Sequence, residues 1–274
     1  MKYYVFNHND FWQRPDGVDN LIYADVVFMW ADWPFEGRVK ELQAMGKKVI
    51  VFEHGFGSFY DYEVNNKPPI ADGYLALGNS SKESLMRVGV PEDHILVAGN
   101  PVYDDIKPKK HGGNNALFVA LHWVRDMVIY NSEMYARLRE AYPEYNWTVK
   151  LNTLTTDFAS PFGERKWNTN VNSPYALEML KEKINDYDII FTPRTSTFES
   201  FARLYGIPVY TIDEQESYKE PGEPGRHLMP NDYLKIGDPV PEYKPFDLTE
   251  YIKRPSVKMK DILNWIKLSS RKNG

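Results

Sequence analysis

Short apolar runs of strand length alternate with amphipathic helical segments along this chain, and the alternation occurs in two series. In the first series the runs are apolar throughout, which is typical of parallel strands covered on both faces of a sheet. The expected strands are Tyr3–Phe6, Asp25–Trp30, Lys48–Phe52, Gly73–Leu77 and His94–Ala98, with helices at Gly37–Met45 and Ser81–Val88. This pattern predicts an α/β fold.

A second series follows Pro101 to Asn115, a stretch whose proline, glycine and asparagine content is typical of a linker. Its expected strands are Ala116–Leu121, Trp147–Leu151, Asp188–Phe191 and Pro208–Ile212, and its expected helices are Ser132–Ala141, Ala176–Ile184 and Ser196–Tyr205. Asp213–Pro245 reads as loop and Val257–Leu268 as a helix. We expect one domain over residues 1–107, a second over 112–256, and a helix over 257–274 that can cross back to the first.

Charge and composition exclude several classes of protein. Among 274 residues, 33 Lys and Arg against 38 Asp and Glu give a net charge of −5, so the whole chain lacks the cationic footprint of a nucleic-acid-binding protein. A local patch of Lys107, Lys109, Lys110 and His111 remains open. The absence of cysteine excludes disulfides and thiolate chemistry, and the cytoplasm is the default location.

Membrane, metal and cofactor signals are also missing from the sequence. The longest apolar runs, such as Val26–Ala31, are far shorter than the roughly 20 residues that cross a bilayer. The six histidines are scattered, and no P-loop or dinucleotide-binding glycine motif follows a strand. We therefore expect no membrane span, no essential metal and no cofactor.

The segment from Phe191 to Ser200 reads as a strand, a hydroxyl-rich turn and the start of a helix. Such a helix N-terminus can bind an anion through its backbone N–H groups, and a carboxylate one turn later can accept hydrogen bonds from a ribose. The candidate donor-binding residues are Arg194, Thr195, Ser196, Thr197 and Glu199. An ordinary capping box between Ser196 and Glu199 explains the same spacing and stays open.

These residues carry a family resemblance. Phe191–Val209 resembles the strand-to-helix segment of GT-B glycosyltransferases and related sugar-nucleotide epimerases, and Gly73–Asp104 is similar to the run that ends the first domain in those families. The resemblance implies an α/β GT-B fold with two Rossmann-like domains facing a central cleft. It also implies a nucleotide-sugar donor in the second domain and a hydroxyl acceptor in the first.

The first domain holds the candidate catalytic residues. Val49–Gly57 resembles the strand and His-Gly motif of capsule- and teichoic-acid-type transferases, including CDP-glycerol glycerophosphotransferases, which implies that His54 is a general base. Asp25 and Asp61 are the alternatives, and the candidate acceptor-side residues are Trp30, Glu53, Gly55 and Tyr60. A hydrogen-bonded histidine at a strand end and aromatic core packing remain open.

Trp147–Asn152, which contains Lys150 near the end of an expected strand, is similar to the K-x-H-P strand end of the same transferases, where the lysine meets the donor phosphates. Here Asn152 and Thr153 replace the His-Pro pair. His122 is a further phosphate-facing candidate, and Ser173 lies where the family holds the nucleotide base. A solvated lysine and a packed His–Trp pair remain the alternatives.

Together these features predict a glycosyltransferase that moves a sugar from a nucleotide diphosphate, with UDP favoured, to a hydroxyl. The acceptor would be a polysaccharide, a glycan or a modified nucleic-acid base, and the reaction would be metal-independent and inverting. The alternatives are a phage-type glucosyltransferase of modified DNA bases, a sugar-nucleotide 2-epimerase or hydrolase, and a nucleotide-sugar binding protein without activity.

Overall fold

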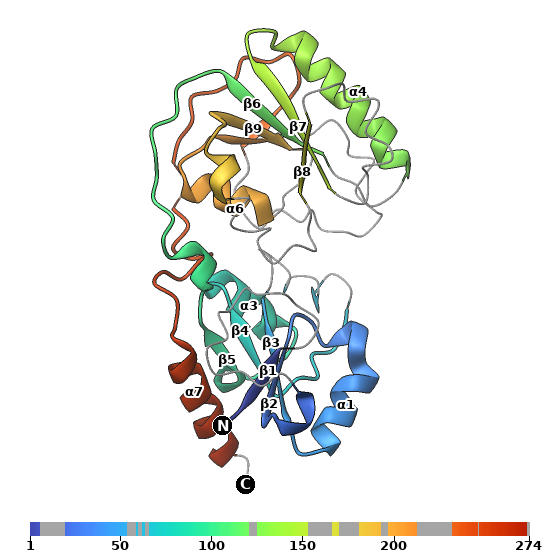
Figure 1. Cartoon of the computed structure of the whole chain (residues 1–274), viewed down its shortest axis with the longest axis vertical. Coiled ribbons are helices and arrows are strands. Elements are labelled where there is room, and N and C mark those ends of the chain that lie inside the picture. Colours follow the sequence, from blue (N-terminus) through green and yellow to red (C-terminus); the bar gives the residue numbers. More distant parts are fainter. Residues whose placement is uncertain are drawn as a thin grey trace. The chain divides into compact units, whose positions relative to one another are not determined.

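The computed structural model describes residues 1–5, 20–53, 59, 62–63, 66–120, 125–152, 166–169, 181–192, 197–212, 232–245 and 247–272. The chain divides into two compact units: unit 1 comprises Met1–Asp105 and Asp247–Gly274, and unit 2 comprises Ile106–Phe246 (Figure 1). Unit 2 is therefore one continuous stretch of chain inserted into unit 1. Residues 247–256, which the sequence analysis assigns to the second domain, belong to unit 1.

Unit 1 contains a five-stranded parallel sheet in the order β1-β2-β3-β4-β5. The strands are β1 (Tyr3–Val5), β2 (Val26–Met29), β3 (Lys48–Phe52), β4 (Gly73–Ala76) and β5 (Ile95–Val97). Each strand joins the sheet beside the one that precedes it in the chain. Because parallel connections are almost always right-handed, this order places the connecting segments on one face of the sheet.

Both faces of this sheet are buried, which explains the continuous apolar runs. On the connecting face, α1 (Glu36–Ala44) and α3 (Asn79–Arg87) pack against strand residues such as Val49 and Val51. On the other face, α7 (Met259–Lys272) packs against the alternate residues, among them Phe28 and Ile50 (Figure 1). The described part of the unit also contains four 3-10 helices: η1 (Leu21–Tyr23), η2 (Trp33–Phe35), η3 (Glu92–His94) and η4 (Pro101–Tyr103).

Unit 2 contains a six-stranded parallel sheet in the order β11-β10-β9-β6-β7-β8. The strands are β6 (Asn115–Val119), β7 (Asn146–Asn152), β8 (Lys166–Thr169), β9 (Ile189–Thr192), β10 (Val209–Ile212) and β11 (Asp232–Leu234). The labelled helices are α4 (Arg125–Ala141) and α6 (Thr197–Leu204), and residues 181–184 are also helical. One face of the sheet packs against α4 around Phe118, Tyr135 and Trp147.

Two strands of unit 2, β8 and β11, are absent from the sequence prediction, which treats residues 213–245 as loop. Both lie at the edges of the sheet. Edge strands are short and have only one neighbour, so they need no continuous apolar run. Lys166–Thr169 and Asp232–Leu234 each contain a mixture of polar and apolar residues and give no strand signal.

Candidate functional site

The order of the unit 2 strands reverses between its two central strands. From β6 the chain continues to β7 on one side, whereas from β9 it continues to β10 on the other. Open parallel sheets bind ligands beyond the carboxyl ends of the strands at such a reversal. Here that point lies between Val119 at the end of β6 and Thr192 at the end of β9. The described strands of unit 1 show no reversal, so topology favours unit 2 as the ligand-binding unit.

Lys150 lies at this edge of the sheet. It pairs with Val119 in the β6–β7 register, and its carbonyl oxygen accepts the N–H of Ala120 at 3.1 Å. Its side chain is half-buried, and burial lowers the pKa of the ammonium from 10.5 to about 8. Because burial penalises the charged form, a phosphate brought to this edge would stabilise the ammonium.

Two threonines occupy equivalent positions on the neighbouring strands. Thr192 and Thr211 are paired in the β9–β10 register and are 1% and 2% exposed. Within the described residues, the Oγ1 of Thr211 has no hydrogen-bond partner. A buried hydroxyl without a partner is costly, so this oxygen marks a place where a polar group from elsewhere would be stabilised.

The helix α6 begins five residues after β9 ends, and the strand-to-helix direction puts its N-terminus at the same edge of the sheet. Thr197 and Glu199 lie in its first turn, although their side chains are outside the description. The other predicted donor-binding residues lie outside the described residues altogether: His122, Ser173, Arg194, Thr195 and Ser196.

Of the predicted residues of unit 1, Trp30 and Glu53 lie at the carboxyl ends of β2 and β3. Trp30 is half-buried and meets Phe35 edge to face with ring centroids 5.7 Å apart, so it packs within the unit. Glu53 is 2% exposed, and its Oε2 accepts the N–H of Leu77 at 2.8 Å. His54, Gly55, Tyr60 and Asp61 lie outside the described residues.

Asp25 does not lie at the carboxyl ends of the unit 1 strands. It precedes β2, at the amino edge of the sheet, and the length of that strand separates it from Trp30. Its side chain is 61% exposed, and its carboxylate accepts the N–H of Lys2 at 2.7 Å. The structure therefore does not bring Asp25 to the edge where the sequence analysis expects a base.

The N-terminus of α3 in unit 1 is covered by residues 247–257, which we call the return segment. The N–H of Ser80, in the first turn of α3, donates to the carbonyl oxygen of Glu250 at 3.0 Å. A Cβ atom on Gly78, the N-cap of α3, would lie 2.3 Å from the carbonyl carbon of Tyr251. Because the chain itself occupies this helix N-terminus, an anion could reach it only by displacing the return segment.

Sequence reasoning missed one buried acid in unit 1. Asp32 is 0% exposed, and its carboxylate receives four hydrogen bonds. It lies within the run Trp30-Ala31-Asp32-Trp33, which the sequence analysis considers only for its aromatic side chains. An acid inside an apolar run directly after a strand is the signal that could have found it.

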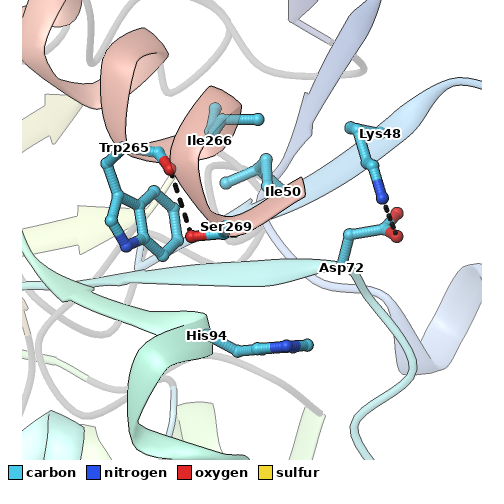
Figure 2. A pocket seen from close by; sticks show the side chains of 7 residues that line it. All are labelled: Lys48, Ile50, Asp72, His94, Trp265, Ile266 and Ser269. Carbon is cyan, nitrogen blue, oxygen red and sulfur yellow. Dashed lines mark hydrogen bonds and ion pairs between the residues drawn. The ribbon is translucent and has the colours of Figure 1, made fainter. Parts of the chain in front are cut away.

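A small hollow of about 30 Å³ lies between α7 and the amino edge of the unit 1 sheet. Figure 2 shows Lys48 paired with Asp72 on one side of it and Trp265 with Ser269 on the other. A volume of this size has room for at least one water molecule. Its amino-edge position separates it from the strand ends that carry Trp30 and Glu53, so we do not assign it to the candidate site.

The described residues contain no group of three His, Asp or Glu side chains arranged to hold a metal ion. Among the helices that the structure describes, none combines the length and the apolar character needed to cross a bilayer.

No protein-family model matches the chain. Over 91 residues it is 31% identical to the UDP-N-acetylglucosamine 2-epimerase of Salmonella typhimurium (strain LT2), and this match covers 33% of the chain and 20% of that enzyme. The structure of the UDP-GlcNAc 2-epimerase of Methanocaldococcus jannaschii, in complex with UDP-GlcNAc and UDP, is similar with a TM-score of 0.52 and 16% identity, over 88% of this chain and 76% of that one. The chain has a GT-B fold.

The expected α/β class with two Rossmann-like domains is thereby confirmed. The UDP-GlcNAc 2-epimerase of Neisseria meningitidis, bound to UDP-GlcNAc, gives a TM-score of 0.49 at 14% identity and covers 70% of this chain and 60% of that one. The sequence match to the Salmonella enzyme covers about a fifth of the length of that enzyme. At 16% identity the Methanocaldococcus structure establishes the fold and leaves the reaction to be argued from the site.

Proposed function

We propose that this GT-B chain is a glycosyltransferase that takes its sugar from a UDP-sugar bound at the carboxyl ends of the unit 2 strands. The observation that carries this proposal is the reversal of strand order between β6 and β9, with Lys150 on the adjoining strand. The half-buried ammonium of Lys150 supplies a positive charge for a diphosphate. The N-terminus of α3 in unit 1 is covered by the return segment, which supports the same placement.

In the proposed reaction, a base removes the proton of an acceptor hydroxyl while its oxygen attacks the anomeric carbon and the bond to the diphosphate breaks. His54 takes the proton. Lys150, Arg194 and the N-terminus of α6 stabilise the charge that develops on the leaving diphosphate, so no metal ion is required for this role. Glu199 accepts hydrogen bonds from the ribose. With the base opposite the leaving group, the product is inverted at the anomeric carbon.

A second candidate function is 2-epimerisation of the UDP-sugar. The named relatives favour it, since the Salmonella and Methanocaldococcus proteins are both UDP-GlcNAc 2-epimerases. Epimerisation needs an acid and a base but no second substrate. Glu53, buried at the end of β3, is the described carboxylate that this candidate would test first.

Incubation with UDP-GlcNAc, and in parallel with other UDP-, GDP- and CDP-sugars, separates these candidates. Release of UDP that depends on an added hydroxyl acceptor supports the transferase. A change in sugar configuration without acceptor supports the epimerase, and release of UDP by water alone supports a hydrolase. Binding of UDP with no turnover of any donor would leave a binding protein and contradict both enzymes.

His54→Ala tests the base directly. A positioned base contributes about 10²- to 10⁴-fold to a rate, so kcat should fall by that factor while the dissociation constant of UDP stays unchanged. If the variant keeps more than about a tenth of the wild-type kcat, His54 is not the base.

A further inference from the structure

The hydroxyl of Thr211 is buried in the sheet of unit 2. The residue is 2% exposed, and within the described part of the chain its Oγ1 has no hydrogen-bond partner. An apolar side chain of the same shape would make the free protein more stable, because a buried hydroxyl without a partner loses its hydrogen bonds to water and gains none. Buried polar groups that carry such a cost are typical of functional positions.

Thr211 lies on the face of the sheet that α6 covers. Its neighbours in β10, Tyr210 and Ile212, belong to the core around α4, and successive side chains of a strand point to opposite faces. The connections from β6 to β7 and from β9 to β10 run in opposite directions along the sheet. Right-handed connections therefore place α4 and α6 on opposite faces, and α6 packs against β10. The side chain of Thr211 thus lies between the sheet and α6.

Thr211 also lies near the carboxyl edge of the sheet, where α6 begins. It pairs in register with Thr192, the last residue of β9, and only Ile212 follows it in β10. The first turn of α6, which starts at Thr197, lies at the same edge. The first N–H groups of a helix have no acceptors within the helix and form the positive end of its dipole. A buried hydroxyl and the donor groups of a helix start therefore meet at one edge, beside the reversal of strand order.

A phosphate group matches this set of donors. A hydroxyl and the N–H groups of a helix start all donate hydrogen bonds, and a phosphate presents several acceptor oxygens to them. Toward the amino edge, the preceding residue on the same face of β10 is Val209, which is apolar and 0% exposed. A partner for the hydroxyl is therefore expected from the carboxyl edge, where Lys150 adds a positive charge.

We propose that the hydroxyl of Thr211 donates a hydrogen bond to a phosphate oxygen of the bound nucleoside diphosphate. This inference rests on the proposed function, in which a UDP-sugar binds at the carboxyl ends of the unit 2 strands. The bound phosphate supplies the acceptor that the hydroxyl lacks in the free protein, so binding removes a cost as well as forming a contact. A transferase and an epimerase would use this contact alike, because both hold the diphosphate.

Three variants separate the hydroxyl of Thr211 from its packing. Thr211→Val removes the hydroxyl and keeps the shape of the side chain, whereas Thr211→Ser keeps the hydroxyl and removes the methyl group. Ser84→Ala, in α3 of unit 1, is the control for the loss of a buried hydroxyl that has a partner. Ser84 is 3% exposed, and its Oγ accepts a hydrogen bond from Nη2 of Arg87 at 2.9 Å.

The first measurement is the affinity of the full chain for UDP and for uridine, by calorimetry and by NMR of the ligand. Thr211→Val should raise the dissociation constant of UDP by about 10- to 100-fold, the usual loss for a hydrogen bond to a charged group, and leave that of uridine unchanged. Thr211→Ser and Ser84→Ala should leave both constants unchanged. An unchanged affinity of Thr211→Val for UDP, or an equal loss for UDP and uridine, would overturn the phosphate contact.

The second measurement is thermal unfolding without nucleotide. Thr211→Val should raise the melting temperature by about 2–5 °C, because it removes a buried hydroxyl without a partner, whereas Ser84→Ala should lower it. A lower melting temperature for Thr211→Val would show that the hydroxyl is bonded within the protein and would overturn the inference. If UDP, CDP and GDP all fail to bind the wild type, the proposed function fails as well. If UDP binds and is released equally in Thr211→Val, only the role of Thr211 is wrong.

Discussion

Binding of UDP to this GT-B chain should take up protons at alkaline pH, because Lys150 is only partly charged there in the free protein. Burial lowers its pKa to about 8, so about half of the molecules carry the proton at pH 8 and about a tenth at pH 9. A bound diphosphate favours the ammonium and returns the pKa toward its ordinary value of 10.5. The expected uptake per UDP is therefore about 0.5 proton at pH 8, about 0.9 at pH 9 and about 0.1 at pH 7.

Isothermal titration calorimetry measures this uptake when the same titration is run in buffers of different ionisation enthalpy. The second pKa of a terminal phosphate lies near 6, so UDP itself contributes little above pH 8. Lys150→Met should abolish the uptake and weaken UDP binding. Lys40→Met, which removes a 65% exposed lysine of α1, is the matched control and should change neither. Uptake that persists in Lys150→Met, or that is absent in the wild type, would refute the role of Lys150.

The same substitution has a second consequence, on stability. The pKa of Lys150 is lower in the folded chain than in the unfolded one, so the unfolded state binds more protons between about pH 8 and 10.5, and stability should rise with pH across that window. Lys150→Met should remove this rise. It should also stabilise the free protein at pH 7 by at most about 3 kcal/mol, with about 1–2 kcal/mol expected for a half-buried ammonium. Urea unfolding at pH 7 and pH 10 checks both statements.

Three further predictions concern single residues. Gly78→Ala should lower the free energy of unfolding by about 1–3 kcal/mol in urea titrations, because its Cβ would meet the return segment at 2.3 Å, whereas Gly37→Ala, with open space around it, should be neutral or stabilising. Glu199→Ala should raise KM for the donor with little change in kcat if the carboxylate binds the ribose, while loss of about 1 kcal/mol of stability with intact kinetics would indicate a helix cap. Burial alone would raise the pKa of Asp188, but hydrogen bonds from backbone N–H groups outweigh burial and lower this pKa. The ionised Asp188 therefore stabilises the fold above pH 3.8, its ordinary pKa, and this stabilisation is lost as the pH falls below that value. When the free energy of unfolding is measured against falling pH, Asp188→Asn should lack this loss of stability.

The strands at the centre of each sheet could be predicted from the sequence, because they are buried on both faces and therefore form continuous apolar runs. Lys48–Phe52 is found with its observed ends, since four consecutive apolar residues follow the lysine. Strand order could not be predicted in this way, because it depends on pairings between distant segments and leaves no local pattern in the sequence. The reversal between β6 and β9, and the placement of residues 247–256 in unit 1, therefore come only from the structure.

The candidate site also contains residues that could be predicted from the sequence and residues that could not. Lys150 could be found because the strand that contains it, β7 (Asn146–Asn152), resembles the K-x-H-P strand end of the transferases. Asp32 could not be given a role, because its donors Tyr62 and Tyr74 are 30 and 42 residues away in the chain. Asp25 was expected at the wrong edge although the sequence carries the signal: it begins the expected strand Asp25–Trp30, and the first residue of a strand in a parallel sheet lies at the amino edge.

The insertion of unit 2 within unit 1 reverses the order in which the two can be completed during synthesis. The core of unit 1 includes Ile262 and Ile266 of α7, packed against strands made from residues 3–98. Those strands must wait, with one face uncovered, until residue 266 has left the ribosome. Unit 2 comes from one uninterrupted stretch, so it can fold first even though its residues are made later than most of unit 1. A released chain truncated after residue 246 should therefore protect unit 2 from protease while the first hundred residues are cleaved.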